Sequence, residues 1–166
     1  MSLERWAEMA RDWKDALCAE SPMADFDEVR VIVEVDGGYT VVMAPIDQET
    51  GVGGLRAHLA GVLARMDRGG HTHRTGRAAV VADCYVSPRD TVCDPAKVYA
   101  EDPGTGATLA VLVIDAGPEG LAMCLLPYRW GDDGTPVWDD DGRVWQTPSG
   151  DLADLARFAA DPWGAS

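Results

Sequence analysis

The chain has 166 residues, with 28 Asp or Glu against 14 Lys or Arg, which gives a formal net charge of -14 at pH 7. Such a surface repels phosphate backbones and anionic lipids, so the composition argues against direct binding to nucleic acid or to a membrane surface. The apolar fraction of 46% and the six tryptophans argue against a disordered chain, and the length predicts one compact domain over residues 1–166.

The start of the chain predicts an amphipathic helix that begins near Ser2 and ends before Pro22. Its apolar residues recur at steps of three and four, which places them on one stripe: Leu3, Trp6, Ala10, Trp13 and Leu17. The first residues carry acidic groups in place of a basic and then apolar signal segment, and no apolar run is long enough to span a bilayer. The sequence therefore predicts a cytoplasmic protein.

A β-hairpin and a second helix follow. The β-branched run 29–35 and the run 39–43 flank Asp36-Gly37-Gly38, a pattern typical of two strands joined by a tight turn. Apolar residues at helical spacing from Leu55 to Met66, before the pair Gly69-Gly70, predict the next helix.

Residues 78–86 predict a buried strand, and the Pro-, Asp- and Gly-rich stretch 87–106 predicts a long irregular loop. The runs 108–115 and 121–128 predict a second hairpin. The pieces 135–138 and 143–145 then indicate a short hairpin, and residues 152–158 a final helix.

Hairpins outnumber crossovers in this order of elements, which favours an antiparallel over a doubly wound parallel sheet. The sequence therefore predicts an α+β fold with a mainly antiparallel five-stranded sheet made of two hairpins plus one strand. We expect the helices to pack on one face of the sheet, and a small C-terminal hairpin to complete the fold.

A glycine-rich turn before the second helix is the first candidate site. Gln48, Gly51, Gly53 and Gly54 follow a strand, and glycines there let backbone N–H groups approach a phosphate at the positive end of the helix dipole. The segment resembles the pyrophosphate-binding turn of the acetyl-CoA-dependent N-acetyltransferase superfamily. That resemblance implies CoA as cofactor and a small acyltransferase as function; the alternative is an ordinary turn in a chain with 18 glycines.

The histidines and cysteines give two further candidates. His71 and His73 lie one residue apart and would both ligate a metal from an extended segment, with Cys84, Asp83 or His58 completing the site of a metal-dependent hydrolase. The alternative is a solvated loop. Cys84 with a histidine base is a candidate nucleophile, but strand periodicity favours a buried core thiol. No C-x-x-C pair occurs, so free thiols are expected.

Tryptophans and aspartates gather near the C-terminus and predict a partner-binding face. Apolar rings rimmed by charge are typical of an interaction surface, although the rings would also serve to cap the sheet edge. The candidate residues are Trp130, Asp132, Asp133, Trp138, Asp139, Asp140 and Trp145.

The central part of the chain resembles a group of small uncharacterised proteins of high-GC Gram-positive bacteria and their phages. The resemblance is carried by the segments 80–86, 94–95, 109–115 and 126–130, a strand, a Pro/Asp loop and an aliphatic hairpin. It implies the same order of strands and no particular activity. Charge and tryptophans then favour a regulatory, accessory or mobile-element protein that docks on a basic protein partner over the acyltransferase and the metal-dependent hydrolase.

Overall fold

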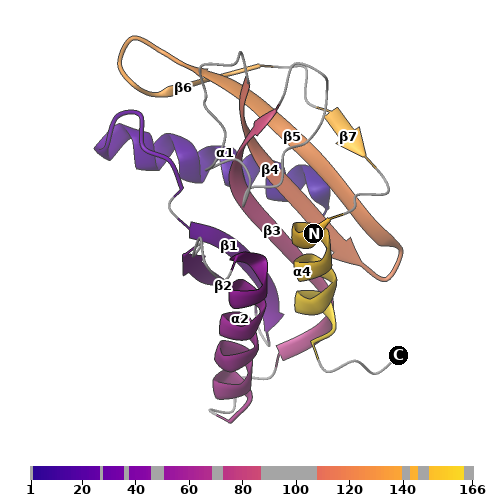
Figure 1. The fold of residues 1–166 in the computed structure, drawn as a ribbon. Coiled ribbons are helices and arrows are strands. Elements are labelled where there is room, and N and C mark those ends of the chain that lie inside the picture. Colours follow the sequence, from indigo (N-terminus) through magenta and orange to yellow (C-terminus); the bar gives the residue numbers. More distant parts are fainter. Residues whose placement is uncertain are drawn as a thin grey trace.

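The structure, a computed structural model, describes residues 2–26, 28–35, 38–45, 51–68, 73–86, 108–139, 143–145 and 150–162 (Figure 1). Its helices are α1 (Leu3–Glu20), α2 (Gly51–Arg68) and α4 (Asp151–Ala160). Its strands are β1 (Glu28–Val35), β2 (Gly38–Pro45), β3 (His73–Val86), β4 (Thr108–Gly117), β5 (Gly120–Trp130), β6 (Pro136–Trp138) and β7 (Arg143–Trp145). The predicted loop 87–106 lies outside the described residues.

All described strand pairs are antiparallel, in the order β2-β1-β3-β4-β5-β6. The five long strands are the two predicted hairpins, β1–β2 and β4–β5, with β3 between them. The predicted C-terminal hairpin is wrong, because β6 and β7 each pair with β5 and not with each other. Strand β5 has 11 residues, so its outer edge is long enough to take both short strands, β6 at one end and β7 nearer the other.

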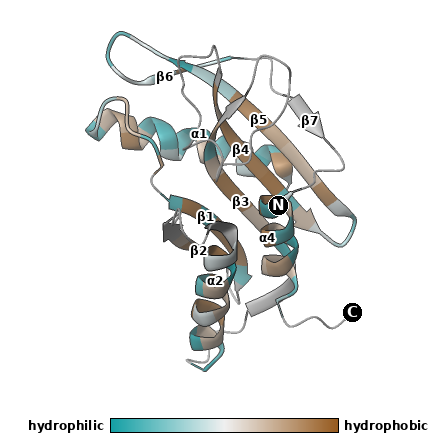
Figure 2. Cartoon of the chain, viewed as in Figure 1, coloured by the Kyte–Doolittle hydropathy of each residue, from teal (hydrophilic) through white to brown (hydrophobic). Residues whose placement is uncertain are grey.

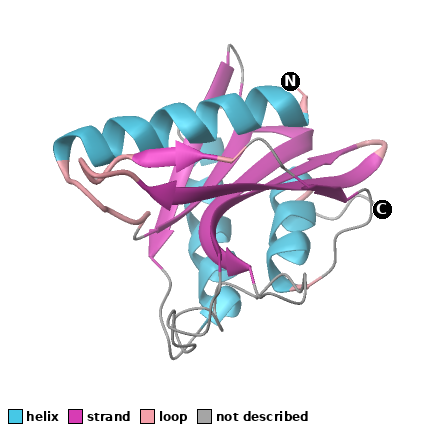
Figure 3. Ribbon diagram, turned by 90° about the horizontal axis from the view of Figure 1, so that it is seen from above, coloured by secondary structure: helices cyan, strands magenta, loops and turns pink. Residues whose placement is uncertain are grey.

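The helices cover both faces of the sheet, which corrects the prediction that they pack on one face. Figure 3 shows α1 along one side of the sheet and the other two helices on the opposite side. The physical reason lies in β3 and β4, where neighbouring residues such as Val80 and Val81 are both completely buried. Strands that are apolar at successive positions need cover on both faces. Figure 2 shows this hydrophobic colouring on β3, β4 and β5.

Two apolar clusters result, one on each face. Helices α2 and α4 bury Leu59, Leu63 and Leu155 against Val80 and Leu112 on one face. Helix α1 buries Trp6 and Ala10 on the other face, against Val81, Val113 and Leu126. None of the helices in the described part of the chain combines the length and the apolar character that crossing a bilayer requires.

Helix α1 begins and ends where local chemistry predicts. The Ser2 side chain accepts a hydrogen bond from the Arg5 backbone N–H at 3.4 Å, which satisfies one of the free donors of the first turn. At the other end the Ser21 N–H donates to the Leu17 carbonyl at 2.9 Å. The chain then returns to the sheet, and the Met23 N–H donates to the Gly134 carbonyl at 2.8 Å. The end of α1 is thereby tied to the turn between β5 and β6.

Candidate functional site

A buried lysine lies at the centre of the contact between α1 and the sheet. Lys14 is 0% exposed. Its Nζ donates to Asp83 Oδ2 at 2.9 Å and to the Ala24 carbonyl at 2.8 Å, and it lies 3.6 Å from Asp25 Oδ1. A buried ammonium group is tolerated only when it is paired and hydrogen-bonded in this way. The cluster therefore joins α1, the segment after it and β3.

Three aromatic rings lie around the buried Lys14 ammonium. The Lys14 ammonium lies 5.1 Å from the ring centroids of Phe26 and Tyr128 and 5.3 Å from that of Trp130. The Tyr128 hydroxyl donates to Asp83 Oδ1 at 3.3 Å, and the Phe26 backbone N–H donates to Oδ2 of the same carboxylate.

Burial determines the protonation behaviour of this cluster. Burial raises the pKa of Asp83, and the Lys14 charge opposes that rise. Burial, and then the Asp83 charge, raise the pKa of Tyr128 far above its usual range, so its hydroxyl stays a neutral donor. Lys14 has no exposed surface and the Asp83 side chain is 11% exposed, so this ion pair holds α1 against the sheet.

The structure brings part of the predicted tryptophan and aspartate face to the C-terminal end of α1. Trp130 and Trp138 are half-buried, and their rings pack edge-on against Tyr128 at 5.2 and 5.3 Å. The Trp138 Nε1–H donates to Asp15 Oδ1 at 3.0 Å. These two indoles therefore cap the α1 side of the core and leave only part of each ring for a partner.

The predicted aspartates differ in role. Asp133 Oδ1 accepts from the Thr135 backbone N–H at 3.1 Å and from its hydroxyl at 2.6 Å, which is turn chemistry. Asp132 and Asp139 are exposed at the same end of the sheet. Asp140 lies outside the described residues, and Trp145 is the last residue of β7.

One flank of α1 carries a stripe of charged residues that sequence reasoning missed. Glu4, Glu8, Arg11 and Asp15 follow one another at steps of four, three and four, so they lie on one side of the helix. The three carboxylates are exposed, and Glu8 Oε2 lies 3.4 Å from the Arg5 guanidinium. The carboxylates Glu4, Glu8 and Asp15 form an acidic stripe, and Asp15 at its end accepts the hydrogen bond from Trp138.

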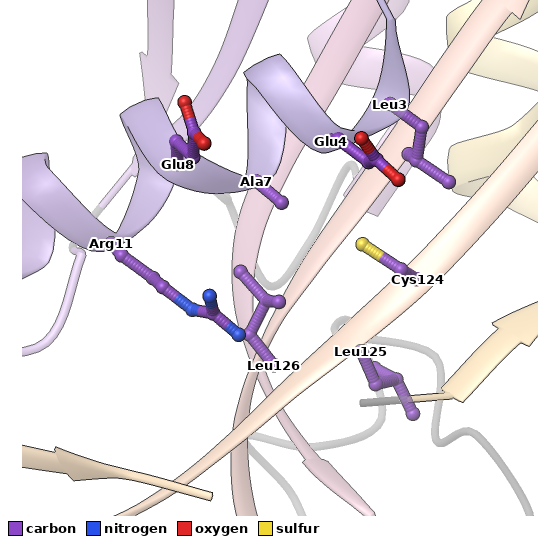
Figure 4. A pocket seen from close by; sticks show the side chains of 8 residues that line it. All are labelled: Leu3, Glu4, Ala7, Glu8, Arg11, Cys124, Leu125 and Leu126. Carbon is purple, nitrogen blue, oxygen red and sulfur yellow. The ribbon is translucent and has the colours of Figure 1, made fainter. Parts of the chain in front are cut away.

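A pocket of about 310 Å³ lies between the N-terminal half of α1 and β5, below the acidic stripe (Figure 4). Leu3 and Ala7 line it from α1, and Cys124 and Leu126 from β5. Figure 4 shows the Arg11 side chain extending from the helix towards Leu126, with Glu4 on the other side of the pocket, near Cys124. The pocket thus has an apolar floor and charged groups at its rim, and its volume is that of a small-ligand or side-chain site.

The Arg11 side chain, which lines this pocket, carries an unsatisfied buried donor. Its Nε is buried and has no hydrogen-bond partner among the described residues. Its planar group lies 5.8 Å from the Trp138 ring centroid. Buried donors are nearly always paired, so this N–H is an exception within the described part of the chain.

Cys124 contributes a neutral thiol to the pocket. Burial raises its pKa to about 11, with the Arg11 charge acting in the opposite direction. The thiolate is the nucleophilic form, so Cys124 behaves as part of the apolar floor near neutral pH.

The predicted phosphate-binding turn lies at the start of α2. Gly51 is the first residue of that helix, Gly53 and Gly54 lie in its first turn, and Gln48 lies outside the described residues. A hollow of about 200 Å³ at this point is lined by Gly53, Arg56, Asp151, Asp154 and Leu155. Two carboxylates of α4 and the Arg56 side chain thus share the hollow beside the first turn of α2.

The metal-site residues are only partly described. His71 lies outside the described residues, His73 opens β3, and His58 is exposed on α2. Within the described ranges, no group of three His, Cys, Asp or Glu is arranged to hold a metal ion. Cys84 is buried in the α2–α4 core, as strand periodicity predicts, and Cys18, Cys84 and Cys124 form no disulfide.

Two signals in the sequence indicate the buried ion pair between Lys14 and Asp83. Lys14 follows Ala10 by four and precedes Leu17 by three, so it occupies the apolar stripe of α1. Asp83 interrupts an otherwise apolar strand. A charged residue in each of two buried surfaces indicates an ion pair between them. The pocket had no such signal, because it depends on how residues 3–11 meet residues 124–126.

Comparison with protein-family models, with curated proteins and with solved structures found no match for the chain.

Proposed function

We propose that this protein is a non-catalytic interaction domain that docks on a basic segment of a partner protein, with an apolar side chain of that segment in the α1–β5 pocket. The observation that carries the proposal is the apolar pocket directly below the acidic stripe of α1. The ionisable groups that converge inside the protein, Lys14 and Asp83, are enclosed by its own rings. The exposed charges are therefore the ones available to another molecule.

The charge of this surface supports a basic partner. Glu4, Glu8 and Asp15 line the flank of α1, and Asp132, Asp133 and Asp139 continue the negative charge at the end of the sheet. Complementary charge raises the association rate and selects the partner, and salt weakens it. The same charge repels nucleic acid and anionic lipid, so the proposed partner is a protein.

The pocket supports an apolar anchor. Interfaces depend on a few side chains that fill well-packed pockets, surrounded by a charged rim. A volume of about 310 Å³ accommodates a leucine or an aromatic ring.

A pair of labelled peptides tests this proposal. Each has two lysines on either side of a central residue, which is phenylalanine in one peptide and glycine in the other. We expect the phenylalanine peptide to bind about 10- to 100-fold more tightly, because burying one such side chain is worth about 1.5–3 kcal/mol. Binding of both peptides should weaken as NaCl is raised.

A charge-matched pair of variants locates the binding surface. Glu4→Gln with Glu8→Gln removes two rim carboxylates, and Asp67→Asn with Glu119→Gln removes two exposed carboxylates elsewhere. We expect the first pair to weaken binding about fivefold, at roughly 0.5 kcal/mol for each exposed charge, and the second pair to change it little. Equal losses in the two variants would show that binding follows net charge alone and would refute the proposed site. Equal affinity of the two peptides would refute the apolar anchor.

A further inference from the structure

Strand β2 presents a row of exposed apolar side chains at the edge of the sheet, away from the α1–β5 pocket. Tyr39 is 39% exposed, Val41 37% and Met43 51%. The three alternate along the strand, so they share one face, while Val42 faces the core under α2 and α4. The Tyr39 ring also packs edge-on against the Trp6 ring of α1, with 5.1 Å between the ring centroids. The exposed row on β2 therefore lies on the same face of the sheet as α1.

The backbone of β2 is paired on one side only among the described residues. Its register with β1 is continuous from Gly38 to Pro45, and no other described strand pairs with it. An edge strand of this length is a template for another strand, and proteins usually protect such an edge with charged residues or an internal proline. Strand β2 contains no acidic or basic residue, and its proline is its last residue, although the whole chain has a net charge of -14.

We propose that a second copy of this chain pairs with β2 through its own β2, in an antiparallel arrangement about a two-fold axis at Val41. In this register Val41 lies opposite Val41 of the second copy, and Tyr39 lies opposite Met43 of the second copy. Each side of the pair thus brings a methionine thioether to an aromatic ring, which is a favourable contact. The arrangement is closed, because the same surface is used on both copies.

Charge favours a second copy over a basic peptide as the occupant of this edge. Strand β2 has no carboxylate that would pair with a basic segment, and two paired β2 strands place no like charges directly opposite each other. The two copies repel each other at long range through their net charge, and salt screens that repulsion. The dimer therefore strengthens with salt, in contrast to docking on a basic partner. The inference does not rest on the proposed function, since it uses the opposite edge of the sheet.

Sedimentation equilibrium of the whole chain tests the dimer, at about 50 and about 500 mM NaCl, between which the screening length falls severalfold. We expect a dimer that tightens at the higher salt. Val41→Lys should weaken it about tenfold or more by placing two like charges opposite each other. Val137→Lys is the matched control, because Val137 is 39% exposed on β6 and receives the same added charge.

Each outcome decides the inference. The inference is overturned if the wild-type protein is monomeric at the higher salt. It is also overturned if Val41→Lys and the control Val137→Lys dimerise equally well, or if both lose the dimer to the same extent. Circular dichroism checks that Val41→Lys is folded; if it is not, Met43→Lys replaces it, with the same expectation. In the wild-type protein, amide exchange of residues 39–43 should slow as protein concentration rises, and slowing confined to another element overturns the inference.

Discussion

Replacing Lys14 by methionine removes the charge at the centre of the α1 contact and keeps most of the side-chain volume. The variant loses the Nζ hydrogen bonds to Asp83 and to the Ala24 carbonyl, at 2.9 and 2.8 Å. It retains an unbranched stem among the rings of Phe26, Tyr128 and Trp130, where a thioether packs well. The main cost is the Asp83 carboxylate, which stays buried without its cation.

The size of this cost follows from the burial of the pair. Lys14 is 0% exposed and the Asp83 side chain 11%. Removing one partner of a buried ion pair typically costs about 3–5 kcal/mol. The whole free energy of unfolding of a domain is about 5–15 kcal/mol, so Lys14→Met should be severely destabilised.

The destabilisation should depend on pH, because Asp83 can take up a proton. Burial already raises the pKa of Asp83, and removing Lys14 removes the main opposing influence, so the pKa in the folded variant rises further. A carboxyl group with a raised folded-state pKa stabilises the fold when protonated, below its unfolded pKa, and that stability is lost as the pH rises through the folded pKa. Lys14→Met should therefore lose more stability relative to wild type at about pH 8 than at about pH 5.

Urea unfolding followed by circular dichroism measures these effects. Asp83→Asn and the double variant complete a double-mutant cycle, in which the two losses should be less than additive by about 1–3 kcal/mol. Additive losses, or a Lys14→Met deficit that is the same at both pH values, would refute the assignment of this pair as the electrostatic centre of the α1 contact.

Three further predictions test other contacts. Gly134→Ala should lower the free energy of unfolding by about 2–4 kcal/mol in urea, because φ is +78° and the new Cβ would lie 2.6 Å from the Pro22 Cβ. Gly120→Ala is the comparison, because φ is +118° there but no atom lies within 4 Å of the new Cβ. It should cost only the backbone strain, about 1–2 kcal/mol. Trp6→Phe removes the 3.0 Å hydrogen bond from Nε1 to Asp115 and should lower the free energy of unfolding by about 1–3 kcal/mol. Burial already raises the pKa of Asp115 and this hydrogen bond opposes the rise, so the loss should be larger at neutral than at acidic pH. An unchanged unfolding midpoint would contradict this contact. Cys124, with its pKa of about 11, should resist iodoacetamide near pH 8 in the native protein and react after unfolding, as peptide mass mapping would show; rapid native labelling would contradict its burial.

The order of the elements was predictable because each long element has a clear period. The stripe from Leu3 to Leu17 gives α1, the β-branched run 29–35 begins the first hairpin, and the aliphatic runs 108–115 and 121–128 give the second. The placement of α1 on the second face was not predicted, although successive apolar residues in β3 and β4 carried the signal. The pairing of β6 and β7 with β5 depends on the free edge of a long strand, which no local pattern in residues 135–145 expresses.

The candidate site was predictable only in part. The aspartates near Trp138 were recognisable as a charged surface beside an aromatic ring. The pocket was not, because Leu3 and Leu126 are brought together by tertiary packing. The unpaired Nε of Arg11 becomes visible only when the neighbours of that atom are known.

The side-chain hydrogen bonds that hold α1 have a consequence for how the chain folds. They join Lys14 to Asp83, Trp6 to Asp115 and Asp15 to Trp138, across 69, 109 and 123 residues of sequence. Contacts between such distant residues form slowly, because a long loop must close before they stabilise anything. During synthesis α1 therefore leaves the ribosome long before the face of the sheet on which it packs has formed. Its apolar stripe stays exposed to solvent until β5 and β6 have been synthesised.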